Sequence, residues 1–239
     1  MSDDLAAVPL QFQIDGQLRD LRPYGTGHIN QTYCSTFETP AGRRRFVHQR
    51  INTNVFRDPD GLMENIRRVT EHLQAKVRAV GGDPRREDLA LVPARGGGVL
   101  WRDPAGAPWR TYHFIEGART YDVVEREDHV RAAGAAFARF QRRLADLPGP
   151  RLHETIPHFG DTRVRFAQFE AALGADPAGR AADARADVDF ALARRDDAPV
   201  LMDLLEAGRV PERITHYDTK LNNVMIDDAT GEGVCVIDL

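Results

Sequence analysis

Cysteine, long apolar runs and blocks of positive charge are all scarce in this chain. Its 239 residues include only Cys34 and Cys235, which show no metal-ligand spacing, so we interpret both as buried, reduced thiols. No apolar run approaches the length that spans a bilayer, and the first residues, Met1 to Asp4, are acidic rather than basic. Neither export nor membrane insertion is signalled, and we expect a cytoplasmic protein without a membrane partner.

The charge balance argues against a nucleic-acid partner. The chain has 32 Lys and Arg against 36 Asp and Glu, a formal net charge of -4, and no basic block is interleaved with aromatic residues. A hydrophobic content of 42% is enough for a sizeable core. No segment signals a protein partner. We therefore expect a globular protein that acts on a small molecule.

The most specific pattern lies between Ile214 and Leu239. His216, Asp218 and Asn223 follow the spacing H-x-D-x-x-x-x-N. In phosphoryl-transfer enzymes such a loop places a carboxylate beside the incoming hydroxyl and turns the Asn side chain toward a metal ion. The pattern therefore predicts a phosphoryl-transfer site.

A second acidic residue completes this pattern. The apolar runs 224–226 and 234–237 flank the turn residues 227–231, and together they predict a β-hairpin. The hairpin returns Asp238 to the neighbourhood of Asn223. Asp238 is therefore the expected second metal ligand.

Each polar residue of this segment has an expected role. Asp218 is the catalytic base, which accepts the proton of the substrate hydroxyl or orients that hydroxyl for in-line attack. Lys220 is a cation that meets the γ-phosphate in the transition state, and His216 braces the backbone of the loop. Asn223 and Asp238 hold Mg²⁺, which prefers oxygen ligands and nucleotide phosphates. The competing interpretation is that these are ordinary turn residues, since Asp and Asn favour turns.

Upstream, the sequence predicts a β-meander and one long helix. Residues 18–52 read as three strands joined by turns, and Asp58 with Pro59 marks a helix start. Three more strand-like runs follow the helix, at residues 89–115. This order of strands around one long helix predicts a kinase-type small lobe. The apolar positions at helical spacing are Leu62, Ile66, Val69, Leu73, Val77 and Val80.

The expected hinge between two lobes is the segment 116–118, Glu-Gly-Ala, which breaks the strand pattern. After it the sequence turns helical, with an apolar helix face over residues 130–144. We therefore predict an α+β, two-lobed, protein-kinase-like fold. Residues 1–116 form its β-rich N-lobe, and residues 117–239 form part of a mainly helical C-lobe.

The turn between the first two strands contains Gly25, Gly27, His28 and Asn30. A G-x-G turn lets backbone N–H groups approach phosphate oxygens without interference from Cβ. Alone, such a turn is more often a plain hairpin. Its order before the helix, the hinge and the catalytic loop favours a nucleotide-binding loop that includes all four residues. Asn30 stands where protein kinases have a third glycine, which points away from that class.

The third strand, residues 43–51, is expected to carry the cation that holds the α- and β-phosphates, and Arg50 is the candidate. A solvated strand arginine is an equally good interpretation. Alternation puts Arg50 on the same strand face as Phe46 and His48. The opposite face carries Val47, Gln49 and Ile51.

The long helix supplies no obvious partner for that cation. In kinases a helix carboxylate pairs with the phosphate-binding cation. Glu64 and Glu71 are available, but at about 100° per residue both fall roughly opposite the apolar stripe. No partner is assigned.

Several short sequence motifs, spread over nearly the whole chain, resemble those of known phosphotransferases. These motifs are Gly25-x-Gly27-His28-Ile29-Asn30, Gln49-Arg50-Ile51-Asn52, Leu62-Met63-Glu64-Asn65-Ile66, Phe114-Ile115-Glu116-Gly117, Thr215-His216-x-Asp218-Thr219-Lys220-x-Asn222-Asn223-Val224 and Val236-Ile237-Asp238-Leu239. They resemble the aminoglycoside phosphotransferase and choline kinase superfamily, and within it bacterial sugar phosphotransferases of the N-acetylhexosamine 1-kinase type. The resemblance implies ATP with Mg²⁺, and transfer to the anomeric hydroxyl of an N-acetylated hexosamine. Adenine is then expected along the strand and hinge that contain Tyr112, Phe114 and Glu116.

Two alternatives to a sugar kinase stay open. One is a kinase for another hydroxyl acceptor, such as an aminoglycoside, choline or another amino alcohol, and the other is a catalytically silent nucleotide-binding fragment. The chain stops at Leu239, one residue after Asp238, where a phosphotransferase still needs substrate-binding helices. We therefore expect a fragment. Expressed alone, it is expected to be poorly soluble, because part of the hairpin's apolar face is exposed, and inactive as a sugar kinase.

Overall fold

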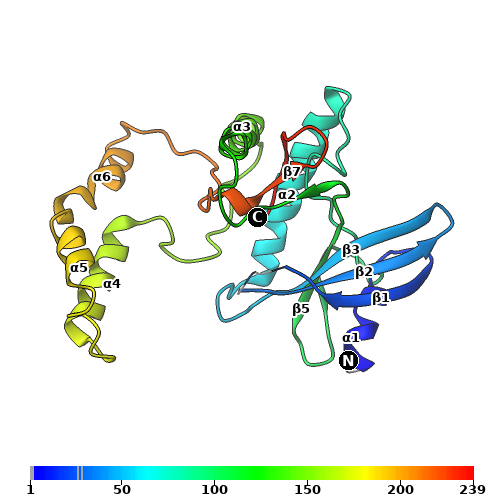
Figure 1. Ribbon diagram of the computed structural model, residues 1–239, viewed down its shortest axis with the longest axis horizontal. Helices are drawn as coiled ribbons and strands as arrows, with labels where there is room; N and C mark the ends of the chain where they lie inside the picture. The colour runs from blue at the N-terminus through cyan, green and yellow to red at the C-terminus, as the bar shows by residue number, and fades with distance from the viewer. Residues whose placement is uncertain (1–2, 26, 28) are drawn as a thin grey trace. The chain divides into compact units, whose positions relative to one another are not determined.

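The computed structural model describes residues 3–25, 27 and 29–239. These residues form two compact units, whose elements are labelled in Figure 1. The first unit contains the chain up to Thr155 together with Thr215–Leu239, and the second contains Ile156–Ile214. Among the described residues, no helix has both the length and the apolar composition needed to cross a membrane.

The first unit is built on a five-stranded antiparallel sheet with the order β1-β2-β3-β5-β4. A short helix, α1 (Asp3–Ala7), and a 3₁₀ helix, η1 (Pro9–Gln11), precede it. Gly42 follows the tight turn between β2 and β3 with a φ of +93°, a conformation that favours glycine. The strands are β1 (Gln17–Pro23), β2 (Gln31–Thr39), β3 (Gly42–Arg50), β4 (Trp101–Arg102) and β5 (Pro108–His113).

Strand alternation gives this sheet two different faces. In the register of β3 with β5, Gln49 lies opposite Arg110 and His48 lies opposite Thr111. His48 is buried, with its ring nitrogens 2.7 Å from Ser35 Oγ and 2.8 Å from Thr111 Oγ1. Gln49 and Arg110 belong to the opposite face. The face of His48 packs on a core cluster that consists of Val8, Phe12, Ile14, Phe37, Phe46, Val92, Ala94 and Trp109.

The long helix that the sequence predicts is α2 (Pro59–Ala79). Asp58 caps its start, since Asp58 Oδ1 accepts a hydrogen bond from Gly61 N at 2.9 Å, and Pro59 occupies the first turn, where it loses no helical hydrogen bond. Val80 is the C-cap residue and is 75% exposed, so it lies outside the apolar stripe that was expected to include it. The buried stripe includes Leu62, Met63, Ile66, Val69, Leu73 and Val77.

A smaller sheet, with the order β6-β7-β8, holds the C-terminal hairpin. Its strands are β6 (Ala118–Arg119), β7 (Val224–Asp227) and β8 (Gly233–Val236), and η3 (Leu221–Asn223) comes directly before β7. The hairpin predicted from alternation is thus present in β7 and β8.

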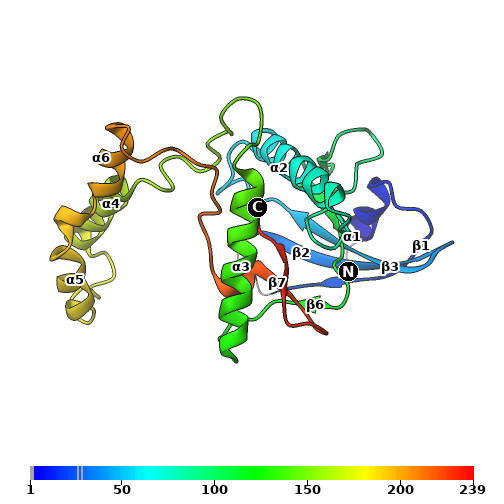
Figure 2. The ribbon, with the colours of Figure 1, turned by 90° about the horizontal axis from the view of Figure 1, so that it is seen from above.

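The helix α3 (Glu127–Leu144) packs against this hairpin, and Figure 2 shows it alongside β7. Ala136 and Phe140 are buried residues of α3. Gly233 at the start of β8 lies so close to α3 that a Cβ there would meet the carbonyl oxygen of Ala132 at 2.6 Å. The close approach of the two backbones therefore requires glycine at this position.

The second unit consists of short helices. Asp161 begins α4 (Thr162–Ala175) by accepting hydrogen bonds from the backbone N–H groups of Arg163 and Val164. The elements that follow are α5 (Arg185–Leu192), η2 (Arg195–Asp197) and α6 (Val200–Glu206).

An antiparallel sheet with one long helix, followed by helices and a C-terminal hairpin, is the α+β arrangement that the sequence predicts. The expected hinge at residues 116–118 lies between β5 and the start of β6, inside the first unit. The division into lobes at residues 116 and 117 stays a prediction.

Candidate active site

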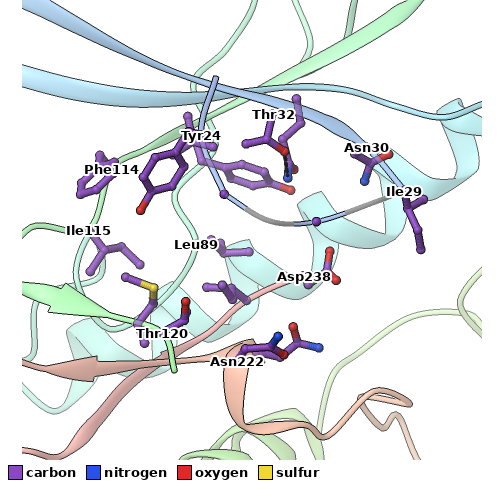
Figure 3. A pocket seen from close by; sticks show the side chains of 18 of the residues that line it. Tyr24, Ile29, Asn30, Thr32, Leu89, Phe114, Ile115, Thr120, Asn222 and Asp238 are labelled. Carbon is purple, nitrogen blue, oxygen red and sulfur yellow. Dashed lines mark hydrogen bonds between the residues drawn. The ribbon is translucent and has the colours of Figure 1, made fainter. Parts of the chain in front are cut away.

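A cavity of about 710 Å³ lies in the first unit, a size typical of small-molecule sites. In Figure 3, Tyr24, Thr32 and Asn30 lie on its upper side, and Asn222 and Asp238 face them from below. Its wall comes from the turn after β1, from β3 and β5, and from the catalytic loop with the C-terminal hairpin. Segments far apart in the sequence therefore meet around one space.

One part of the cavity wall is aromatic and aliphatic. Tyr24 and Phe114 meet edge to face, with ring centroids 5.5 Å apart. Tyr112 is buried beside them, and this burial raises the pKa of its hydroxyl. Such a wall suits a flat aromatic ring such as a purine base. The aliphatic side chains on it are Leu89, Ile115, Met225 and Ile237.

The predicted catalytic loop, residues 216–223, brings its polar side chains together. Lys220 Nζ lies 2.6 Å from Asp218 Oδ2, and Asn223 Nδ2 lies 3.0 Å from the same oxygen. Asn223 Nδ2 also donates to the backbone carbonyl of Asp218 at 2.8 Å. Lys220 and Asn223 line the cavity, and Asp218 is bonded to both.

Asp218 is ionised at neutral pH. Burial alone would raise the pKa of its carboxyl group, but hydrogen bonds from Lys220 and Asn223 outweigh burial and lower this pKa below its usual value. The pKa of Lys220 is raised, because its ammonium group donates to Asp218. A carboxylate with a lowered pKa is a weak base. It therefore suits the orientation of a hydroxyl group and the acceptance of its proton late in the transfer.

His216 holds the catalytic loop in place. Its Nδ1 accepts a hydrogen bond from the backbone N–H of Asp218 at 3.2 Å, so Nε2 carries the proton and donates to the carbonyl of Ile237 at 3.0 Å. The ring packs edge to face against Phe137 and Phe140, with centroids 5.5 Å and 6.1 Å away. This geometry agrees with the expected bracing role, because it ties the loop to the end of the hairpin.

Asn223 and Asp238 offer oxygen atoms to the cavity. The amide nitrogen of Asn223 donates hydrogen bonds to Asp218, which leaves Oδ1 as a ligand for a cation. Asp238 has a φ of 67°, a left-handed conformation that is uncommon for a residue with a Cβ and that recurs at functional sites. Two oxygen ligands of this kind fit Mg²⁺, which takes its other ligands from phosphates and water.

The predicted nucleotide loop lies on the cavity wall at Gly25, Gly27 and Asn30, whereas His28 lies outside the described residues. Gly25 has a φ of +81°, which favours glycine. Asn30 Oδ1 accepts a hydrogen bond from the backbone N–H of Asn52 at 3.0 Å, so this side chain ties the turn to the segment after β3. A Cβ at either glycine would meet nothing within 4 Å.

Arg50 lies on the opposite face of β3 from the one that its predicted role requires. It shares a face with Phe46 and His48, as alternation predicts, and its Nη1 lies 3.5 Å from Gln31 Oε1. Gln49 is the β3 residue whose polar side chain lines the cavity. Because successive strand residues point to opposite faces, one position separates a cavity residue from a residue behind the sheet. The expectation for Arg50 is therefore corrected: it is not among the described residues of the cavity wall.

Glu116 is also absent from the described cavity wall. Its carboxylate forms a two-pronged ion pair with Arg45, with 3.0 Å between Arg45 Nε and Glu116 Oε1. The guanidinium of Arg45 in turn stacks over Phe114, 3.7 Å from the ring centroid. Glu116 therefore supports the aromatic wall through Arg45 rather than facing the nucleotide space.

The two carboxylates of α2 bond elsewhere. Glu64 Oε2 lies 2.9 Å from His153 Nε2, and Glu71 Oε2 lies 2.8 Å from Arg67 Nη1. Neither glutamate lines the cavity as far as the structure describes it. No helix carboxylate is thus assigned as a partner of a phosphate-binding cation.

Some polar residues of the cavity wall carry no sequence prediction. Alternation could have found Arg110, since it lies two residues before Tyr112 on the same strand face. Gln49 is found only from the register of the sheet, in which it lies opposite Arg110. Asp122 and Asn222 have no such signal, although Asn222 Nδ2 donates to Asp122 Oδ1 at 2.9 Å. Asp122 and Asn222 come together because β6 pairs with β7 of the hairpin.

Two solved structures have a similar fold. One is a spectinomycin phosphotransferase, APH(9)-Ia, in complex with ADP and spectinomycin, with a TM-score of 0.52 and 11% identity over 93% of this chain. The other is an aminoglycoside phosphotransferase from Alicyclobacillus acidocaldarius, with a TM-score of 0.52 and 17% identity over 98% of this chain. The match covers 64% of each of those two chains. At these identities the likeness shows the fold, which is the kinase-like α+β fold of aminoglycoside phosphotransferases.

The family comparison is independent of the fold. Residues 20–239 match the model of the phosphotransferase enzyme family, APH. The match includes the glycine turn, β5 and the whole catalytic loop with Asp238. Because it extends over most of the sequence, the chain belongs to the phosphotransferase enzyme family.

Proposed function

We propose that this chain carries the site of an ATP-dependent phosphotransferase, which moves the γ-phosphate to a hydroxyl group of a small molecule. One observation carries the proposal. A single cavity combines an aromatic wall with Lys220, Asn223 and Asp238, and Asp218 is bonded to the first two of these. Base binding and phosphoryl transfer need these two kinds of wall in one place.

In this proposal adenine lies against the aromatic wall, near Tyr24, Tyr112 and Phe114, and the phosphates extend beneath Gly25 and Gly27 toward the catalytic loop. The ADP complex of the spectinomycin phosphotransferase supports a nucleotide in this fold. Along the sequence, the described lining residues fall into one group up to Ile115 and another from Thr120 onward. We therefore keep residues 1–116 and 117–239 as the proposed lobes.

The chemistry follows from the catalytic loop. The carboxylate of Asp218 accepts a hydrogen bond from the acceptor hydroxyl and aims its oxygen at the γ-phosphorus. The new oxygen–phosphorus bond forms as the bond from the γ-phosphorus to the bridging oxygen breaks, ADP leaves, and the hydroxyl proton goes to Asp218. Lys220 stabilises the charge on the transferring phosphoryl group. Lys220 and Asp218 form an ion pair.

Mg²⁺ supplies charge neutralisation of the nucleotide phosphates when it is bound. Asn223, through Oδ1, and Asp238, through its carboxylate, are the residues that would hold it. His216 positions both ends of this pair, because it bridges the loop and the carbonyl of the residue before Asp238.

For the acceptor we propose the anomeric hydroxyl of an N-acetylated hexosamine. This proposal is supported by the sequence motifs around Gly25, Gln49, Phe114 and His216, which resemble those of sugar phosphotransferases of that type. The alternatives are the hydroxyl groups of aminoglycosides, of choline and of other amino alcohols.

The test combines binding and turnover. Titration calorimetry with MgATP is expected to show one site on the chain, and ³¹P NMR with the complete gene product is expected to show ADP formation that depends on the acceptor. The acceptor panel contains N-acetylglucosamine, N-acetylgalactosamine, galactose, choline and an aminoglycoside. Transfer to choline or to the aminoglycoside alone would reject the sugar acceptor, and absence of MgATP binding would reject the kinase site itself.

A further inference from the structure

Arg110 is a buried cation at the cavity. It lies on β5, is 2% exposed and lines the cavity together with Gln49 and Tyr112. Its guanidinium carbon lies 5.3 Å from the centroid of the Tyr112 ring. A charged side chain at such depth is costly unless an opposite charge or several hydrogen bonds compensate for its lost hydration.

No acidic side chain is a hydrogen-bond partner of Arg110 among the described residues. Nε donates to the neutral amide oxygen Gln49 Oε1 at 2.9 Å, and Nη1 donates to a backbone oxygen of Leu239 at 3.3 Å. Among the ion pairs of the described residues, none includes Arg110, whereas Arg45 pairs with Glu116 and Arg86 pairs with Asp227. The buried guanidinium thus lies at the wall of a cavity without an acidic side chain paired to it.

The position of Gln49 explains how this arginine is oriented. Protein kinases place the phosphate-binding cation on β3, but the polar β3 side chain that faces the cavity here is a neutral amide. Gln49 lies directly opposite Arg110 in the sheet register, and its amide oxygen holds Arg110 Nε. Gln49 therefore cannot replace the kinase cation, but it fixes the direction of one that comes from the neighbouring strand.

We propose that Arg110 binds the α- and β-phosphates of the nucleotide, and that the phosphate-binding cation of this chain has moved from β3 to β5, with Gln49 as its positioning residue. This inference rests on the proposed function. An anionic diphosphate supplies the counter-charge that no acidic side chain gives the buried guanidinium, and a planar guanidinium donates to two phosphate oxygens at once.

The test compares nucleotides with and without phosphates. Titration calorimetry in Mg²⁺ measures the affinities of adenosine, ADP and ATP for the unmutated chain, for Arg110→Gln and for the control Arg50→Gln, which removes a β3 arginine behind the sheet. Arg110→Gln is expected to weaken ADP and ATP by about 10-fold to 100-fold, the scale of a charge-assisted hydrogen bond, and to leave adenosine unchanged. Arg50→Gln is expected to leave all three affinities unchanged.

A structural arginine would behave differently. If Arg110 only supported the fold, Arg110→Gln would lower the unfolding temperature of the free chain and weaken adenosine as much as ADP, and either result overturns the inference. Loss of a buried charge that no acidic side chain pairs with is instead expected to leave the unfolding temperature of the free chain unchanged or higher. If Arg110→Gln does not fold, Gln49→Leu and Arg110→Lys decide the matter. Both are expected to lower the ratio of ADP affinity to adenosine affinity, and an unchanged ratio in both overturns the inference.

These outcomes separate the inference from the proposed function. If the unmutated chain does not bind MgATP, the kinase site fails and Arg110 has no phosphate to bind. If the unmutated chain binds MgATP and Arg110→Gln binds it equally well, the inference alone fails.

Discussion

The side-chain amide of Asn223 donates to the carboxylate of Asp218, with 3.0 Å between Nδ2 and Oδ2. This contact fixes which way the amide points, because its nitrogen is used on Asp218 and its oxygen is left for the cavity. One residue therefore couples the proposed base to the proposed metal position. The two roles can be separated by substitution.

Asn223→Asp is expected to lower turnover while keeping MgADP binding. It retains an oxygen ligand but places a second carboxylate beside Asp218, where like charges repel and disturb the orientation of the base. Asn223→Ala removes the ligand as well and is expected to weaken MgADP at least about tenfold. Titration calorimetry and steady-state kinetics measure the two effects, and equal MgADP affinity in the unmutated chain and Asn223→Ala would contradict the metal role.

In the complete gene product, Asp218→Asn is expected to reduce turnover by about 100-fold or more, the scale of a lost general base, and to leave nucleotide binding nearly intact. The amide keeps the shape of the side chain but cannot accept the hydroxyl proton. Asp228→Asn is the matched control, because Asp228 is an aspartate of the hairpin turn that pairs with Arg119. Turnover of Asp218→Asn within a few fold of the unmutated chain would remove Asp218 from the role.

The face of β3 that borders the cavity was not predictable from the sequence. The catalytic loop, the hairpin and α2 were, because each is a local pattern with its own spacing, cap or turn. In β3, however, each face pairs an apolar residue with a polar one: Phe46 with His48, and Val47 with Gln49. Alternation therefore defines two faces but does not choose between them.

Packing against distant segments of the chain determines which face of β3 borders the cavity. The face of Phe46 is covered by the N-terminal segment around Phe12 and by Val92, so Gln49 is left toward the cavity. The same argument applies to Glu116, whose partner Arg45 lies 71 residues earlier in the chain. A local pattern at Glu116 predicts a hinge, but it carries no information about that ion pair.

Asp238→Ala is expected to weaken ATP in the presence of Mg²⁺, because the cation loses a carboxylate ligand. Without Mg²⁺ the difference should shrink, or even reverse, since Asp238 then only repels the phosphates. Calorimetric titrations with Mg²⁺ and with a chelator measure both conditions. Equal affinity of Asp238→Ala and the unmutated chain for MgATP would exclude Asp238 as a metal ligand.

Gly27→Ala is expected to weaken ADP more than adenosine while leaving the stability of the free chain unchanged. A Cβ at Gly27 meets nothing within 4 Å, so the added methyl group interferes only with a ligand that approaches the turn. Gly25→Ala is the comparison, because its φ of +81° should cost about 1 kcal/mol of stability in addition. Thermal unfolding and calorimetry test both, and equal losses for adenosine and ADP in Gly27→Ala would argue against a phosphate loop.

Asp88, directly before the cavity residue Leu89, is a buried acid without a full set of partners. It is 3% exposed, its Oδ1 accepts from the backbone N–H of Leu89 at 2.8 Å, and its Oδ2 has no hydrogen-bond partner among the described residues. Burial raises the pKa of its carboxyl group to about 8, although the Leu89 hydrogen bond and the charge of Arg143 act in the opposite direction. The folded chain thus holds a neutral Asp88 at neutral pH.

Asp88→Asn is expected to remove a pH dependence from the free energy of unfolding. In the unfolded chain Asp88 ionises near the ordinary aspartate pKa of 3.8, whereas in the folded chain it keeps its proton to about pH 8. Folding therefore binds a proton between these values, and this group alone lowers stability by about 1.4 kcal/mol for each unit of rising pH in that window. The stabilisation that protonated Asp88 contributes is full below about pH 4 and lost above about pH 8.

The difference in stability between Asp88→Asn and the unmutated chain should therefore shift in favour of the variant as the pH rises through this window, because all other groups titrate alike in both. Urea unfolding at unit pH steps measures this difference, and a constant value across the window would show that Asp88 is ionised in the fold.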